Sequence, residues 1–174
     1  YEMLRSLVGS EMCIRDSALI QLNFSAGLTT GFTYAITNIS ISGVNNSGTF
    51  TYSNSIGDWT AQDGTASYAY AGDFNGTITD NVLKLSTGSN ALMLMPQTVP
   101  AGAEISITYT ATANSTNQVT FNGTKKVAIG GVEWKKGSNI CYKLILPTGA
   151  EAITYSTVVN PWGEEDSQDK TTQP

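Results

Sequence analysis

Apolar and polar residues alternate along most of the chain after position 18, and short groups of turn-forming residues separate the alternating runs. A period of two is typical of β-strands that turn one face to a core and the other to solvent. The clearest run is Glu104–Thr112. Its predicted core face consists of Ile105, Ile107, Tyr109 and Ala111.

The segment Val132–Leu146 combines an aromatic entry, a turn and a second clear strand. Trp134 and Gly137 mark the turn, and the pattern predicts a hairpin in a half-buried antiparallel sheet. Because side chains alternate along a strand, one face is expected to pack into the core. That face consists of Ile140, Tyr142, Leu144 and Leu146. Cys141 lies on the other face and is expected to pack rather than react.

A shift in the alternation interrupts the long run Phe32–Val44. Apolar residues occupy even positions as far as Ile36 and odd positions from Ile39. This slip by one residue predicts a β-bulge near Thr37–Asn38. A turn rich in Asn and Gly is expected to join this strand to a return strand at Thr49–Tyr52, which would close a hairpin.

The other segments are shorter. Ser53–Gly76 is punctuated by Gly and Asp and is predicted to be rich in loops. Val82–Leu85 and Ala91–Met95 are predicted to form another hairpin, with Ala91–Met95 at the centre of the core because it is apolar on both faces. Asn122-Gly123 predicts a tight turn, and Ala152–Val159 is predicted to be the last strand. Many short strands without a helical period predict an all-β fold, an antiparallel β-sandwich.

Composition and charge narrow the possible functions. With 174 residues, the chain is long enough for one domain with a buried core. It has no histidine, which excludes Ser–His and Cys–His catalysis and His-ligated metal sites. Its net charge is −5 and its lysines are scattered, so nucleic acid is not an expected partner. We predict no enzyme activity, no catalytic or metal-ligating residues and no cofactor.

Both ends of the chain differ from the middle. Leu7–Asp16 resembles a translated sequencing adapter, and both arginines of the chain lie in the first 17 residues. Residues 1–17 are therefore interpreted as non-native, the alternative being a short native helix. Gly163–Pro174 is acidic and has no apolar residue, so we predict a disordered tail. The predicted domain spans residues 18–162.

The order of these segments resembles the fimbrillin (Mfa-like) family of Bacteroidales surface proteins. The matching stretches are Tyr34–Val44, Asn46–Tyr52, Gly57–Trp59, Leu92–Thr98, Ile105–Tyr109 and Trp134–Leu146. The residues that carry the resemblance, called the family-motif residues below, are Pro96, Gln97, Trp134, Gly137, Tyr142 and Trp162. The resemblance extends over Phe32–Trp162, and the chain departs from it at Ile140, where the family usually has an aromatic residue.

The resemblance implies a transthyretin-like, Greek-key β-sandwich that forms the C-terminal part of a longer precursor. It also implies export to the cell surface or outer membrane as part of a fimbrium, with membrane contact only through an N-terminal lipid anchor absent from this sequence. The expected partners are other pilin subunits or host and bacterial surface ligands, and the expected means of assembly is strand exchange.

Two segments are compared as strand donors. The tail after residue 162 lacks apolar residues, so Ala152–Val159 is the better donor, although its pattern fits the last strand of the sandwich itself better. This favours a tip or accessory subunit over a stalk pilin. The candidate strand-exchange residues are Ile153, Tyr155, Val158 and Val159.

An alternative function is carbohydrate binding by aromatic residues in the loop-rich segment. The candidate residues are Trp59, Tyr68, Tyr70 and Phe74. Exposed, coplanar rings of Trp59 and Tyr70 would favour sugar binding. The competing interpretation, favoured by the usual burial of large aromatic side chains, is that these rings cap the ends of the sandwich core.

Overall fold

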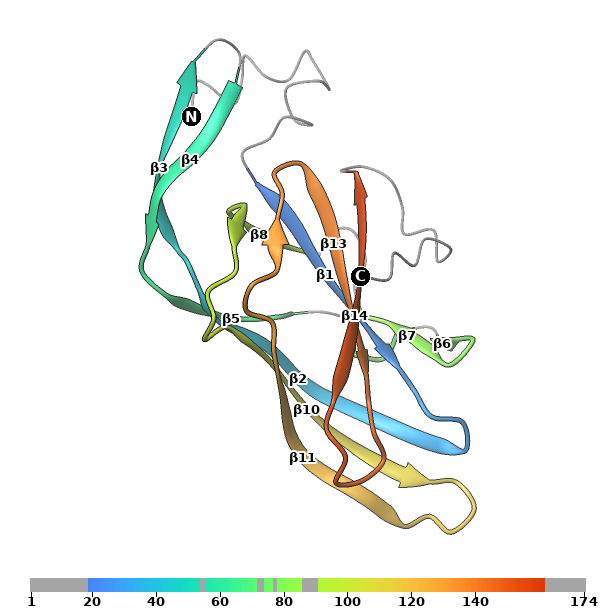
Figure 1. Ribbon diagram of the computed structural model, residues 1–174. Helices are drawn as coiled ribbons and strands as arrows, with labels where there is room; N and C mark the ends of the chain where they lie inside the picture. The colour runs from blue at the N-terminus through green and yellow to red at the C-terminus, as the bar shows by residue number, and fades with distance from the viewer. Residues whose placement is uncertain (1–18, 54–55, 72–73, 77, 86–90, 162–174) are drawn as a thin grey trace.

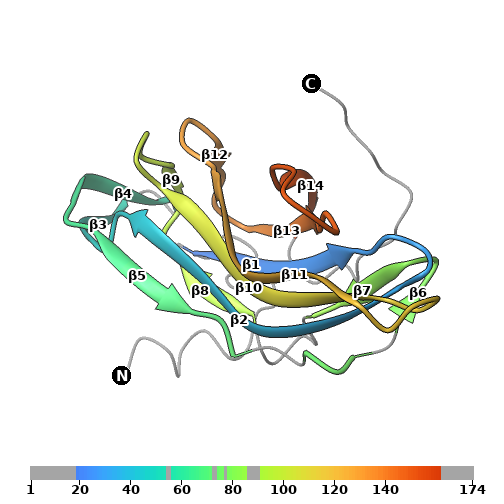
Figure 2. The ribbon, with the colours of Figure 1, turned by 90° about the horizontal axis from the view of Figure 1, so that it is seen from below.

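The structure, a computed structural model, describes residues 19–53, 56–71, 74–76, 78–85 and 91–161. Within these ranges every regular element is a β-strand, and most strands lie in two stacked sheets (Figures 1 and 2). The predicted all-β sandwich is therefore confirmed. The predictions for residues 1–17, for the tail at 163–174 and for Trp162 lie outside the described residues.

The first sheet is built around β1. Its six strands are β1 (Ile20–Gly27), β6 (Ile78–Thr79), β7 (Val82–Lys84), β8 (Leu92–Leu94), β13 (Ser138–Ile145) and β14 (Thr154–Pro161). β13 pairs with one side of β1, and β7 and β8 pair with the other side. β14 pairs with β13 and forms an outer edge of the sheet.

The pairing of β1 with β13 is parallel, whereas all other pairings among the described strands are antiparallel. Parallel neighbours need a long connection, and here that connection builds the whole second sheet. The hairpin predicted within Val132–Leu146 is wrong, because the two strands of this segment do not pair with each other. β12 (Glu133–Trp134) pairs with β9 (Gln97–Thr98), and β13 lies between β1 and β14.

The second sheet contains β2 (Phe32–Val44), β5 (Ala66–Ala69), β10 (Glu104–Ala113) and β11 (Val119–Ala128), in the order β11-β10-β2-β5. The predicted strand at Phe32–Val44 and the predicted core face of β10 are confirmed. Asn38 pairs with Thr108 and Ile36 pairs with Tyr109, so Thr37 is an extra residue. The bulge predicted from the slip in alternation is therefore confirmed.

Several predicted hairpins are wrong because local turn signals do not determine which strands pair. Thr49–Tyr52 lies in β3 (Ser47–Ser53), which pairs with β4 (Ile56–Asp63) rather than with β2. β4 and β5 lie within the segment that was expected to be mainly loop. Asn122-Gly123 lies inside β11, because the turn between β10 and β11 falls at residues 114–117.

The two short apolar runs do not pair with each other either. β7 and β8 each pair with β1, one after the other along the same side. β8 therefore lies beside the central strand rather than at the centre of the core, and its Met93 side chain is 47% exposed. Leu94 and Met95 are buried.

One hydrophobic core joins the two sheets. Its largest fully buried side chains include Phe24, Ile39, Ile41, Tyr109, Trp134 and Tyr142. Tyrosine hydroxyls also connect the layers: Tyr34 donates to the Leu146 carbonyl at 3.0 Å, and Tyr109 donates to the Pro147 carbonyl at 2.6 Å. These bonds fix the end of β13 against β2 and β10. Among the described residues there is no helix long and apolar enough to cross a membrane.

The β3–β4 hairpin, called the arm below, projects beyond the end of the sandwich (Figure 1). All seven residues of β3 are exposed. β9 and β12 form a two-stranded ribbon, called the β9–β12 ribbon below. The surface is recessed between the arm and this ribbon, and several family-motif residues line the recess.

Candidate functional site

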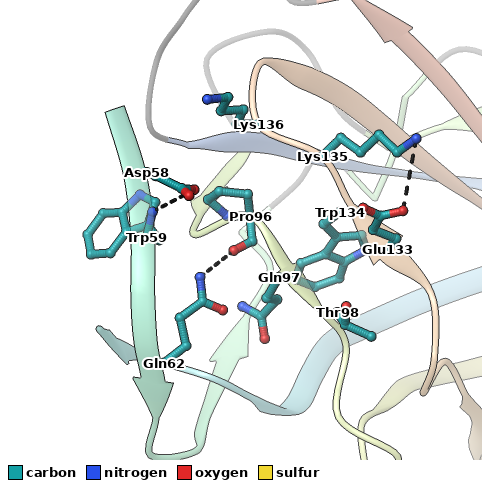
Figure 3. Close-up of a pocket in the computed structure, with 10 residues that line it drawn as sticks. All are labelled: Asp58, Trp59, Gln62, Pro96, Gln97, Thr98, Glu133, Trp134, Lys135 and Lys136. Carbon is teal, nitrogen blue, oxygen red and sulfur yellow. Dashed lines mark hydrogen bonds and ion pairs between the residues drawn. The ribbon is translucent and has the colours of Figure 1, made fainter. Parts of the chain in front are cut away.

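A pocket of about 560 Å³ lies between the arm and the β9–β12 ribbon (Figure 3). One wall is formed by residues between Asp58 and Gln62 on the arm. The other walls come from Pro96–Thr98 and from Glu133–Lys136. Three segments that are distant in the sequence thus meet at one place, and two of them carry family-motif residues.

Gln97 fastens the ribbon to the end of β2 through its buried side-chain amide. Its Oε1 accepts a hydrogen bond from the Asn45 amide at 2.8 Å, and its Nε2 donates to the Asn45 carbonyl at 3.2 Å. The same Nε2 lies 3.3 Å from the Met95 carbonyl. Buried polar groups are stable only when they have partners, and this amide satisfies two backbone groups where β2 ends. Gln97 therefore has a structural role at the base of the arm.

Trp134 and Tyr142 form a buried polar contact beneath the pocket. The Trp134 Nε1–H donates to the Tyr142 hydroxyl oxygen at 3.0 Å, and both side chains are almost completely buried. Burial raises the pKa of Tyr142 to about 12, and the hydrogen bond from Trp134 opposes this shift. Gly137 follows with φ of 71°, which favours glycine, and its amide donates to the Leu19 carbonyl at 3.1 Å. These three residues fix the entry into β13.

Two long polar side chains tie the arm to the rest of the protein. Gln62 Nε2 donates to the Pro96 carbonyl at 2.7 Å, and Lys136 Nζ donates to the Gly57 carbonyl at 3.0 Å. Figure 3 shows the Gln62 side chain reaching from β4 across to Pro96. An isolated two-stranded hairpin is only marginally stable in water, so these contacts are needed to hold the arm in place.

The pocket is also lined by charged side chains. Asp58 and Glu133 stand beside Lys135 and Lys136, and the Glu133–Lys135 ion pair is long, at 3.9 Å, and exposed. In the described part of the chain, no three His, Cys, Asp or Glu residues gather where they could hold a metal ion. The pocket is a junction between the arm and the sandwich.

The candidate strand-exchange residues all lie in or beside β14. Ile153 is buried, and Tyr155 packs on Tyr142 with ring centroids 5.4 Å apart. Val158 is half-buried, whereas Val159 is 55% exposed although it pairs with buried Ile140. β14 therefore packs against the sandwich core near its first residues, whereas apolar surface is exposed near its last residues.

The four aromatic candidates for sugar binding are not brought together. Tyr70 is only 3% exposed, and its ring packs edge-on against Phe24 with centroids 4.9 Å apart. Tyr68 and Phe74 are half-buried against the core. Trp59 lies on the arm, where it packs against Phe50. A shared platform of Trp59 and Tyr70 is therefore wrong, because Tyr70 fills the space between the sheets.

Cys141 packs as expected. It is buried, and its Sγ lies 3.7 Å from the Ser25 hydroxyl on the neighbouring strand. The contacts made by Gln62, Lys136 and Asn45 were not anticipated, because each joins residues that are far apart in the sequence. The exposed position of Phe50 beside Trp59 was not predicted either. The alternation along its strand looks the same as that of a strand with one buried face.

Comparisons with known proteins agree with this architecture. The family model described as fimbrillin-like matches residues 16–162. A fimbrial protein from Bacteroides vulgatus has a similar crystal structure, with a TM-score of 0.57, 17% identity, and coverage of 83% of this chain and 54% of that chain. A candidate cell adhesion protein from Bacteroides uniformis gives a TM-score of 0.48 at 17% identity, covering 83% of this chain and 51% of that one. The chain thus spans about half the length of these solved structures. No curated protein matches it.

Proposed function

Because the chain belongs to the fimbrillin-like family, we propose that it acts at the bacterial cell surface as a pilus subunit or adhesin and works through protein–protein contacts. The family match covers both sheets, the arm and the ribbon. We place the protein outside the cell, with the outer membrane as the surface to which the fimbrium is attached. The role that we propose is structural or adhesive, without enzyme activity, as the family match suggests.

The proposal rests mainly on β14, which is an edge strand without charged residues. This strand forms one edge of the first sheet, and Thr154–Pro161 contains no charged residue. Proteins usually protect exposed edges with charges, bulges or covering loops, because an open edge accepts another strand. An uncharged edge strand with partly exposed apolar side chains is suited to strand exchange between subunits. Since β14 already pairs with β13 along its whole length, a tip or accessory position fits better than a stalk position.

Peptide incorporation tests this exchange. A fluorescein-labelled peptide with the sequence of Ala152–Pro161 is mixed with the protein, and fluorescence anisotropy is followed for several days. If β14 can leave its sheet, the peptide takes its place beside β13 and the anisotropy rises slowly. No rise for this peptide, with a protein that remains folded, would contradict strand exchange at β14.

A matched control peptide carries Asp at the positions of Ile153 and Tyr155. Ile153 is 5% exposed, and Tyr155 packs on Tyr142. Carboxylates at these two positions would lose their hydration without gaining a partner. The control peptide is therefore expected to remain free, and equal incorporation of both peptides would show that binding does not use the β14 position.

A further inference from the structure

One face of the arm carries three aromatic side chains that take no part in the core. Phe50 is 44% exposed and Tyr52 is 69% exposed, while Trp59 is half-exposed. In the register of the arm, Phe50 lies opposite Trp59 and Tyr52 lies opposite Gly57. Residues that are paired across a hairpin point to the same face, so Phe50, Tyr52 and Trp59 form one surface, called the aromatic strip below.

Two glycines, which have no side chain, allow the rings of Phe50 and Trp59 to approach the backbone of the arm closely. A Cβ atom at Gly57 would stand 2.5 Å from Phe50 Cζ, and one at Gly48 would stand 3.3 Å from Trp59 Cε3. Each ring therefore occupies the space that a side chain would otherwise fill. Both rings lie over the backbone of the arm, and both keep part of their surface exposed.

The two central rings are close but not coplanar. The centroids of Phe50 and Trp59 are 5.3 Å apart, and their planes meet at 47°. Figure 3 shows the Trp59 indole on the other side of β4 from Pro96 and Trp134, although Trp59 is also among the residues that line the pocket. Two tilted faces suit two successive rings of a ligand that are turned relative to each other, rather than one flat ring.

The charges of the arm select against an anionic ligand. Residues 47–63 contain Asp58 and Asp63 but no lysine or arginine. Asp58 pairs with Thr51 and Asp63 pairs with Ser47, so both carboxylates belong to the face opposite the aromatic strip. The strip itself is uncharged, and the protein as a whole has a net charge of −5. A neutral ligand is therefore favoured over nucleic acid, sulfated glycans or an anionic membrane surface.

We propose that the aromatic strip binds neutral oligosaccharides by stacking their pyranose rings on Phe50, Tyr52 and Trp59. The C–H groups on one face of a pyranose are weakly positive, and they complement the negative face of an aromatic ring. The Tyr52 hydroxyl adds a polar group at one end of the strip. This site lies outside the segments assigned to subunit contact and goes beyond the proposed function.

Isothermal titration with three neutral probes tests the proposal: cellohexaose, xylohexaose and mannohexaose. At least one of them is expected to bind the native protein. Phe50→Ala and Tyr52→Ala are each expected to weaken that binding about tenfold, whereas Phe50→Tyr, which keeps the ring, retains it. Failure of all three probes to bind the native chain would overturn the proposal.

Val119→Ala is the matched control. Val119 is 58% exposed on β11, in the sandwich rather than on the arm, so its removal shortens an exposed apolar side chain without touching the strip. Equal weakening by Val119→Ala and Phe50→Ala would overturn the proposal. Sedimentation velocity on the same variants identifies the competing occupant. If the native protein is a dimer that Phe50→Ala dissociates, the strip is an interface between two copies and not a glycan site.

Discussion

Trp134 and Tyr142 show how single residues fix the centre of this fold. Trp134 comes from the β9–β12 ribbon and Tyr142 comes from β13, and their hydrogen bond lies beneath the junction that carries the arm. The sequence predicted that Tyr142 faces the core, because alternation along β13 is clear. It could not predict that the indole N–H is the partner of the tyrosine hydroxyl, because Trp134 belongs to a strand that pairs elsewhere.

Substitution of Tyr142 is expected to change how stability depends on pH. In the folded protein, burial raises the Tyr142 pKa from 10.0 to about 12, so folding favours the protonated hydroxyl. The stabilisation is fully present below pH 10 and is lost as the pH rises toward 12. The expected loss is on the order of 2 kcal/mol. Urea denaturation of the native protein between pH 8 and pH 12 measures it.

Tyr142→Phe removes this ionisation. At pH 8 the variant is expected to be about 1–3 kcal/mol less stable, because the buried Trp134 N–H loses its acceptor. Its stability then falls less steeply above pH 10 than that of the native protein. Some decline remains, since the pKa of Tyr109 is also raised, mainly by burial. Parallel curves for the two proteins would contradict the assignment to Tyr142.

At the scale of elements, the sequence predicts strands much better than it predicts their partners. The bulge at Thr37 and the core face of β10 follow from alternation alone, since a slip or a periodic face is a local property. The pairing of β3 with β4, and of β1 with β13, depends on contacts across the whole chain. The turn signal Asn122-Gly123 fails because both residues lie within a strand, β11, that pairs with β10 on both sides of them.

The arm provides the most direct test at this scale. Its described tethers to the sandwich include the bonds from Gln62 to Pro96 and from Lys136 to Gly57. The double variant Gln62→Ala and Lys136→Ala is expected to speed amide hydrogen exchange in the arm by about three- to tenfold. Global stability is expected to change by less than about 1 kcal/mol, because neither side chain belongs to the core.

Lys135→Ala is the control for the arm. Lys135 is adjacent to Lys136, but its side chain is 74% exposed and makes only a long ion pair with Glu133. Exposed pairs of this kind contribute little to stability, so exchange in the arm is expected to stay at the native rate. Mass spectrometry of arm peptides after timed deuterium labelling measures all three proteins. An unchanged arm in the double variant would mean that other contacts hold it.

For the whole molecule, the arrangement separates two kinds of surface. β14 forms an uncharged edge on the sandwich, whereas the aromatic strip lies on an arm that projects away from it. The other long edge, β11, carries Lys125 and Lys126, and lysines on an edge discourage pairing with another strand. We therefore propose two separate surfaces: the β14 edge for contact with a neighbouring subunit and the aromatic strip for a neutral oligosaccharide.

Sedimentation velocity over a range of concentrations tests directly whether β14 is the edge used for contact between subunits. The comparison uses Val159→Lys on β14 and Val119→Lys on β11, two substitutions at valines that are 55% and 58% exposed on edge strands. We predict that the native protein and Val119→Lys associate as concentration rises, while Val159→Lys stays monomeric. A native chain that remains monomeric throughout, or a Val159→Lys variant that associates as the native chain does, would contradict it.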